Sequence, residues 1–216
     1  MELMCIGDCT VDLFLEIHEA SVNCEIDPHE CKLVLDYADK IPVTRLTKVV
    51  GAGNAANVAV GASRLGIKTA LMTLVGDDSE GREMRQVFSD EGIVGDYVMT
   101  DSGKRSNLSA IINFRGERTI LVYHEKRQYR WPEGVETEWV YLTSAGEGYE
   151  GLYDEVVEYV RQKGIKLAFQ PGSRQLRAGR DKLARVLEQA ELMIVNKREA
   201  QELLGNESEA VEDLLA

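Results

Sequence analysis

The alternation of strand-like and helix-like segments most constrains the fold of this chain. From residue 54 onward, short apolar runs alternate with stretches in which apolar residues recur at helical spacing. Such alternation predicts a mainly parallel sheet with helices on both faces. We expect strands at 68–75, 96–100, 139–143, 165–169 and 192–195, and helices at 54–65, 79–91, 150–163, 179–190 and 197–204.

The first 50 residues follow a different pattern. Residues 2–6 form an apolar strand that ends at Gly7-Asp8, and strands are expected at 11–18, 31–36 and 46–50, with a turn at Asp27-Pro28. We therefore expect one domain over residues 1–216, in which residues of about 11–50 contribute a β flap outside the main sheet. A hairpin is expected further on, from strands at 108–113 and 118–124.

Composition and charge exclude several classes of function. With 44% hydrophobic and 29% charged residues, the chain is an ordinary globular protein. Its net charge of −12 disfavours nucleic-acid binding, which needs a basic face, but leaves local backbone sites for ATP phosphates possible. No secretory signal or membrane-spanning run is found, so we expect a cytoplasmic protein without a membrane partner.

The four cysteines are Cys5, Cys9, Cys24 and Cys31. Their spacing matches no common zinc motif, and we expect reduced thiols. A metal site that recruits His29 beside Cys24 and Cys31 is the weaker alternative.

The stretch VVGAGNAANVAVGASRLG, residues 49–66, contains the strongest local motif. Its GAGNAA segment matches the G-x-G-x-x-A of a dinucleotide-binding loop. In that fold an acidic residue follows about 20 residues later, and the fingerprint opens the fold. Here the candidate acids Asp77 and Asp78 come slightly late, and an all-β block precedes the loop. An NAD(P)-binding enzyme therefore remains an alternative, although the surrounding sequence does not match that of a dinucleotide-binding fold.

Two asparagines in this stretch suggest another chemistry. Asn54 could cap the helix, but Asn57 lies three residues later on the same side of the first turn. Two amides offer both donors and acceptors, which suit hydroxyl groups better than phosphates. The structural alternative for this pair is a helix cap, Asn54, and a packing residue, Asn57. For Asp12, a further candidate on the strand expected at 11–18, the structural alternative is a solvated strand residue.

The ordered set of motifs along the chain resembles the ribokinase (PfkB) family of carbohydrate kinases. The family's G-G-x-x-x-N-x-A pattern falls on residues 52–59, with Ala52 in place of the first glycine, and V-G-x-D-x-x-G falls on residues 75–81. Asp12 stands where the family places a sugar-binding acid. Further matches are Gly116-Glu117-Arg118-Thr119, QPGSRQLRAG and NKREA, so the resemblance covers essentially the whole chain.

The resemblance implies a ribokinase-like three-layer α/β sandwich with a small β lid. It implies that Asp12, Gly53, Asn54 and Asn57 bind a sugar or nucleoside, and that ATP and Mg²⁺ are the cofactors. Asn196 and Glu199 would assist the metal and phosphate, largely through water, with no direct metal ligand. The lid would close over the sugar and pair two copies as a homodimer. Asp77, Asp78 and Glu80 are expected to be turn and cap residues, and Arg174 a surface residue.

Complete family members also carry T-x-G-x-x-G and D-T-x-G-A-G-D segments, the second of which ends in the general-base Asp. Neither segment is found in these 216 residues. We therefore expect the N-terminal two-thirds of a kinase, inactive alone, with an exposed sheet edge. A non-catalytic sugar-binding module is the second alternative, beside the NAD(P)-binding enzyme.

Overall fold

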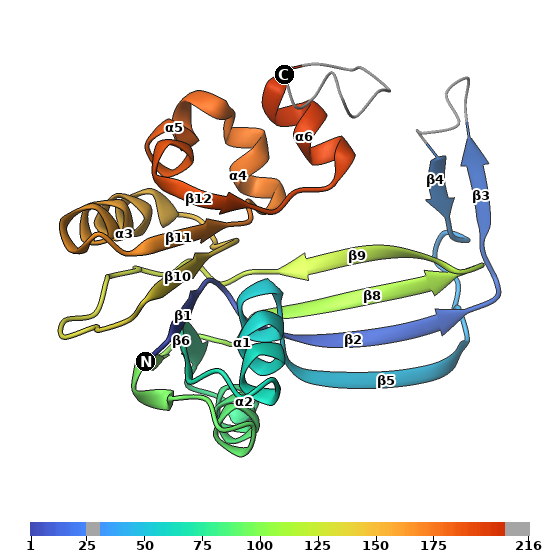
Figure 1. Cartoon of the computed structure of the whole chain (residues 1–216). Helices are drawn as coiled ribbons and strands as arrows, with labels where there is room; N and C mark the ends of the chain where they lie inside the picture. Colours follow the sequence, from blue (N-terminus) through green and yellow to red (C-terminus); the bar gives the residue numbers. More distant parts are fainter. Residues whose placement is uncertain (25–30, 206–216) are drawn as a thin grey trace.

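A computed structural model describes residues 1–24 and 31–205, and its centre is a parallel sheet (Figure 1). The six strands lie in the order β12-β11-β10-β1-β6-β7 and are all parallel to their neighbours. Their bounds are Leu3–Ile6 (β1), Thr69–Gly76 (β6), Val98–Asp101 (β7), Trp139–Leu142 (β10), Lys166–Phe169 (β11) and Ala190–Met193 (β12). The predicted fold class is confirmed.

Alternate residues of the central strands build two separate cores. Met4 and Ile6 of β1 pack into one core, whereas Cys5 packs into the other. Helices α1 (Asn54–Arg64) and α2 (Ser79–Asp90) contribute to the Cys5 core, and α3 (Tyr149–Lys163) and α5 (Arg180–Gln189) to the Met4 core. Burial raises the pKa of the Cys5 thiol to about 12 and favours its neutral form.

Smaller helices complete the α/β part. The short helix α4 (Ser173–Ala178) was not predicted, whereas α6 (Lys197–Leu204) was. A 3-10 turn, η1 (Gly95–Tyr97), precedes β7. For the last ten residues the sequence predicts an amphipathic helix with Val211, Leu214 and Leu215 on one face, and this segment lies outside the described residues.

A second, four-stranded sheet extends away from the sandwich (Figure 1). Its order is β5-β2-β8-β9, with bounds Val43–Ala52 (β5), Thr10–Ile17 (β2), Leu108–Phe114 (β8) and Glu117–Tyr123 (β9). We call this sheet the lid. Residues 11–50 supply only two of its strands, because the predicted hairpin at 108–124 supplies the other two.

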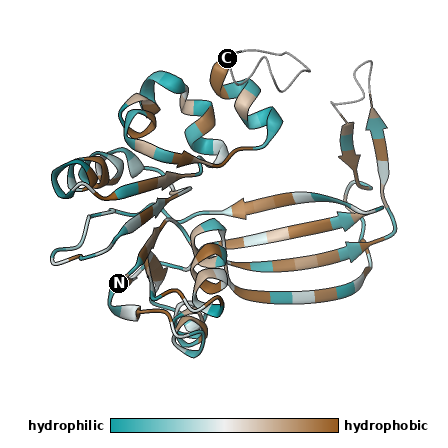
Figure 2. Cartoon of the chain, viewed as in Figure 1, coloured by the Kyte–Doolittle hydropathy of each residue, from teal (hydrophilic) through white to brown (hydrophobic). Residues whose placement is uncertain are grey.

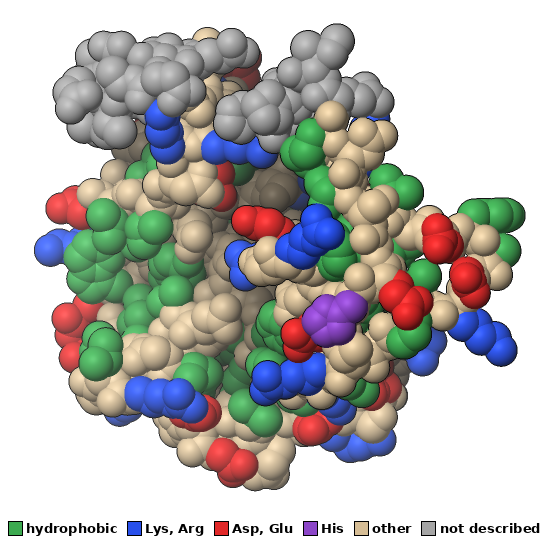
Figure 3. Space-filling model, turned by 90° about the vertical axis from the view of Figure 1, so that its right-hand side faces the viewer, with side chains coloured by type: hydrophobic (Ala, Val, Ile, Leu, Met, Phe, Trp, Pro, Cys, Tyr) green, Lys and Arg blue, Asp and Glu red, His purple; other side chains and the backbone are tan. Residues whose placement is uncertain are grey.

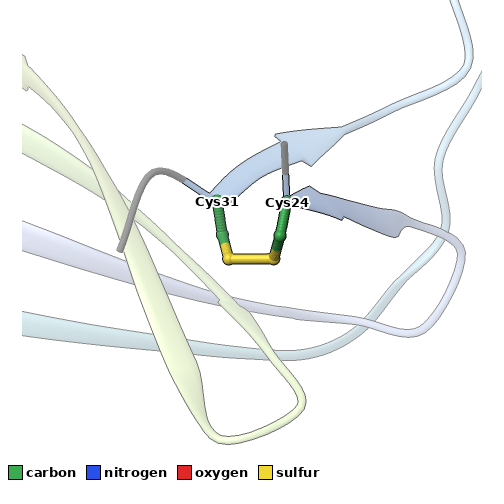
Figure 4. Close-up of a disulfide and its surroundings, with 2 residues drawn as sticks. All are labelled: Cys24 and Cys31. Atoms are coloured by element: carbon green, nitrogen blue, oxygen red, sulfur yellow. A yellow bond between two sulfur atoms is a disulfide. The ribbon is translucent and has the colours of Figure 1, made fainter. Parts of the chain in front are cut away.

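A small hairpin extends from the lid and contradicts one expectation. Strands β3 (Ser21–Cys24) and β4 (Cys31–Val34) pair with each other, and Cys24 and Cys31 form a disulfide (Figure 4). The expectation of reduced thiols is wrong for these two cysteines, because the antiparallel register places them directly opposite each other. The predicted turn at Asp27-Pro28 and His29 lie outside the described residues. Across residues 1–24 and 31–205, no cluster of metal-ligating side chains occurs.

Among the described residues, β12 is one edge strand of the central sheet. Leu192 and Ile194 beside this edge are exposed. None of the helices in the described part of the chain has the length and apolarity needed to cross a lipid bilayer.

Candidate functional site

The junction between β1 and the lid brings several polar side chains together. β1 ends at Ile6 and β2 begins at Thr10, so the connection from β1 to the lid consists of three residues, Gly7, Asp8 and Cys9. The Asp8 amide donates to the Ser144 carbonyl, at 2.9 Å, just beyond β10. In open α/β sheets, ligands bind at the carboxyl ends of the strands, which is where this junction lies.

Gly53 allows α1 to begin directly against this junction. Its φ of +106° lies in the region that favours glycine, and a Cβ built there would lie 2.7 Å from the Asp8 carbonyl oxygen. A side chain at this position would be disfavoured by the backbone angle and would also clash with the Asp8 carbonyl oxygen. The close approach of α1 to the β1–lid junction therefore depends on this glycine.

The two predicted asparagines lie on the first turn of α1. Gly53 is the N-cap residue, and no side chain caps this helix, so the cap alternative for Asn54 is wrong. Instead, the Asn54 Nδ2 lies 3.5 Å from the Thr143 Oγ1 at the end of β10. The backbone N–H of Asn57 donates to the Gly53 carbonyl oxygen. Asn54 and Asn57 are both exposed residues.

Asp12 lies on β2, in register with Val49 on one side and Ser109 on the other. Its Oδ1 is buried and receives no hydrogen bond within the described structure. Burial raises the pKa of the carboxyl, and a hydrogen bond from Ser109 partly offsets this effect. A buried acceptor without a donor is costly and calls for an explanation, such as a functional role or a bound water, ion or ligand.

A second carboxylate, Asp8, is also part of the junction and was not predicted as a site residue. Tyr129 donates its hydroxyl hydrogen to Asp8 Oδ1 at 2.8 Å and accepts a bond from the Gly146 amide at 2.9 Å. Burial, with a contribution from the Asp8 charge, raises the pKa of Tyr129 and keeps it a donor. The Gly7-Asp8 pair in the sequence was the available signal, but Tyr129 lies 121 residues away.

Asn196 and Glu199 lie elsewhere. They form a capping box at the start of α6, in which Asn196 Oδ1 accepts from the Glu199 amide and Glu199 Oε2 accepts from the Asn196 amide, both at 2.9 Å. The preceding strand β12 is separated from β1 by β10 and β11. The structure thus gives this pair a local structural role and does not bring it to the β1–lid junction.

The loop at 51–54 does not have the surroundings of a dinucleotide-binding loop. In the dinucleotide fold, the glycine-rich loop follows a strand of the parallel sheet. Here Gly51 and Ala52 are the last two residues of β5, which belongs to the lid and pairs antiparallel with β2. Figure 3 shows acidic and basic side chains interspersed on the lid side of the molecule, where a nucleic-acid-binding face would need to be uniformly basic.

A parallel α/β sandwich with a four-stranded mixed lid that continues from its strand β1 defines the class of ribokinase-like proteins. Residues 2–216 match the pfkB family of carbohydrate kinases, and the chain belongs to this family.

Solved structures support the same fold. The ribokinase of Arabidopsis thaliana, solved with ribose and ATP, superposes with a TM-score of 0.77 at 17% identity, over 99% of this chain and 66% of that chain. The fructokinase of Halothermothrix orenii has a TM-score of 0.73 at 18% identity, over 97% of this chain and 73% of that chain. At these identities the likeness concerns the fold alone.

Curated relatives are sugar kinases. The aminoimidazole riboside kinase of Salmonella typhimurium is 35% identical over 65% of this chain and 38% of its own length. The 5-dehydro-2-deoxygluconokinase of Photobacterium profundum is 36% identical over 41% of this chain and 27% of its own length. The chain thus spans well under two thirds of the length of these relatives.

Proposed function

We propose that the chain forms the acceptor-binding part of an ATP-dependent kinase that phosphorylates a hydroxyl of a sugar or nucleoside. The acceptor would lie at the β1–lid junction, between Asp12 on the lid and the first turn of α1. Asp12 would accept hydrogen bonds from substrate hydroxyls, and Asn54 and Asn57 would bind neighbouring hydroxyls. Gly53 would let the substrate approach the backbone closely.

The buried, unpartnered Oδ1 of Asp12 is the observation that carries this proposal. A hydrogen bond to a charged group contributes about 1.5–3 kcal/mol, so two hydroxyls on this carboxylate would dominate the affinity. An analogue that lacks one of these hydroxyls would leave the carboxylate oxygen unpaired again, which is how such a site would discriminate between ligands.

The residues of this chain act on the acceptor, and ATP would supply the phosphoryl group. The lid would exclude water, which otherwise competes as an acceptor. Among the described residues, no group of three or more His, Cys, Asp and Glu side chains is placed to hold a metal ion. We propose that Asn196 and Glu199 assist the metal and phosphate only through water, since the capping box uses Asn196 Oδ1 and Glu199 Oε2.

We also propose that the lid pairs with the lid of a second copy. The lid strands are hydrophobic along much of their length (Figure 2). Their register places a row of apolar side chains on the lid face opposite Asp12. Within this row, Leu46 is 64% exposed and Leu121 is 57% exposed. The register places the following residues on that face: Leu13, Leu15, Leu46, Ala110, Ile112 and Leu121.

Calorimetric titration with D-ribose, D-fructose and inosine, followed by a coupled assay of ATP consumption, tests the proposed function. We expect at least one of the three to bind. Binding with ATP consumption supports a kinase, whereas binding alone supports a sugar-binding module. If NADH bound and none of the three polyols did, the proposal would be wrong.

A further inference from the structure

His124 lies on the same side of the lid as Asp12. His124 directly follows β9 and lies two residues after Val122. Since side chains two residues apart in an extended strand point to the same face, His124 and Val122 share a face. Val122 is in register with Ser109, and Ser109 is in register with Asp12. The alternation of side chains therefore directs His124 to the Asp12 side, at the base of the lid.

There His124 meets a carboxylate of the sandwich. Its Nδ1 lies 3.5 Å from Asp8 Oδ2, and the Asp8 side chain is 6% exposed against 36% for His124. A formed N–H···O bond is shorter, about 2.9 Å, and Oδ2 has no donor within the described residues. Tyr129, whose hydroxyl oxygen accepts from the Gly146 amide, donates to the other carboxylate oxygen, Oδ1, and so fixes Asp8. A small movement of the imidazole would therefore complete the bond.

The other charged groups near His124 have partners of their own. Glu125 accepts from Lys104 and from the Tyr123 hydroxyl. Lys126 pairs with Glu147, and the buried Arg127 pairs with Asp101. Among these neighbours, His124 is the group whose ring nitrogen faces the unpartnered oxygen of Asp8.

We propose that His124 is a specificity-determining residue of the acceptor site and that Asp8 is its positioning residue; this rests on the proposed function. Asp8 holds the proton of the neutral imidazole at Nδ1, so that Nε2 presents a lone pair. The ligand it fits is a neutral polyol with two hydroxyl donors, one for Asp12 on the lid and one for His124 Nε2. The histidine thus joins sandwich, lid and substrate.

The tautomer of His124 can be measured without any ligand. Long-range ¹⁵N–¹H NMR at pH 8, with the signal assigned by its loss in His124→Gln, is expected to show the Nδ1–H form in the wild-type chain. Asp8→Asn is expected to reduce the population of that form. An Nε2–H form in the wild-type chain, or no change in Asp8→Asn, would overturn the positioning role.

Binding of D-ribose, D-fructose and inosine tests the specificity role. A neutral hydrogen bond corresponds to about 3- to 10-fold in Kd, which is the loss expected for His124→Ala. His124→Gln, which retains an acceptor, is expected to recover part of it, and the exposed His18→Gln serves as the control. Unchanged affinity in His124→Ala would overturn this inference alone. If the wild-type chain bound none of the three, the proposed function and the inference would both fail.

Discussion

Asp78 and Ser106, 28 residues apart, join the sandwich to the base of the lid. Asp78 Oδ2 accepts from the Ser106 amide at 2.7 Å, and Oδ1 accepts from the Ser106 hydroxyl at 2.6 Å. Asp78 also caps α2 by accepting from the Gly81 amide. Burial opposes ionisation of this carboxyl, but the bonds from Ser106 and Gly81 outweigh it and lower its pKa. The predicted cap role is therefore confirmed, together with a long-range contact.

Asp78→Ala is expected to destabilise the chain by about 2–4 kcal/mol, because it removes a helix cap and two charge-assisted bonds. Urea unfolding measures the effect, and the neighbouring exposed Asp77→Ala is the control. Because the folded-state pKa of Asp78 is lowered, its contribution is present above the unfolded value of about 3.9 and is lost as the pH falls through the folded value. A deficit that persisted undiminished well below that range would contradict the charge-based account.

Asp12→Asn is expected to be at least as stable as the wild-type chain at pH 7. Burial raises the folded-state pKa of Asp12, so ionisation costs stability. This cost is absent below the unfolded pKa of about 3.9 and grows as the pH rises through the folded value. Thermal melts across this window should show the melting temperature of Asp12→Asn rising relative to that of the wild type as the pH increases. Glu16→Gln, which removes one negative charge from the same strand, is the matched control. A less stable Asp12→Asn at pH 7 would refute this prediction.

Two glycine substitutions in and before α1 should act in opposite directions. Gly53→Ala combines a left-handed backbone angle with a Cβ 2.7 Å from the Asp8 carbonyl, and should cost about 1–3 kcal/mol. At Gly61, inside the helix, a Cβ meets nothing within 4 Å, so Gly61→Ala should stabilise by up to about 1 kcal/mol. Denaturant midpoints of the two variants test the predicted fit of α1 against the junction, and equal effects would speak against it.

Leu46→Lys is expected to weaken self-association, because it places a charge in the apolar row of the lid. Sedimentation velocity over a range of concentrations measures the association. Leu65→Lys is the matched control, since Leu65 is 83% exposed but ends α1 rather than lying on the lid. Should both variants associate like the wild type, the lid would not be the dimer interface.

Local sequence patterns predicted most elements, because apolar periodicity reports the burial of each segment. They missed β3, whose four residues are all exposed and leave no alternation of burial to detect. They also assigned the lid to residues 11–50, since alternation in 108–123 does not reveal which sheet the hairpin joins. The sequence motifs pointed to Asp12, Gly53 and Asn54, which lie at or beside the junction, and their binding role stays a prediction. The contacts of Asp8 with Tyr129 and His124 could not be predicted, because they depend on tertiary folding.

The binding of D-ribose, D-fructose and inosine to Asp12→Asn, compared with wild type and Glu16→Gln by calorimetry, tests the central claim most directly. We predict that Asp12→Asn loses about 10- to 100-fold in affinity, because a charge-assisted hydrogen bond is lost while the fold is retained. Glu16→Gln should bind as the wild type does. Equal affinity in Asp12→Asn and the wild type would contradict the assignment of this carboxylate as the group that binds the acceptor.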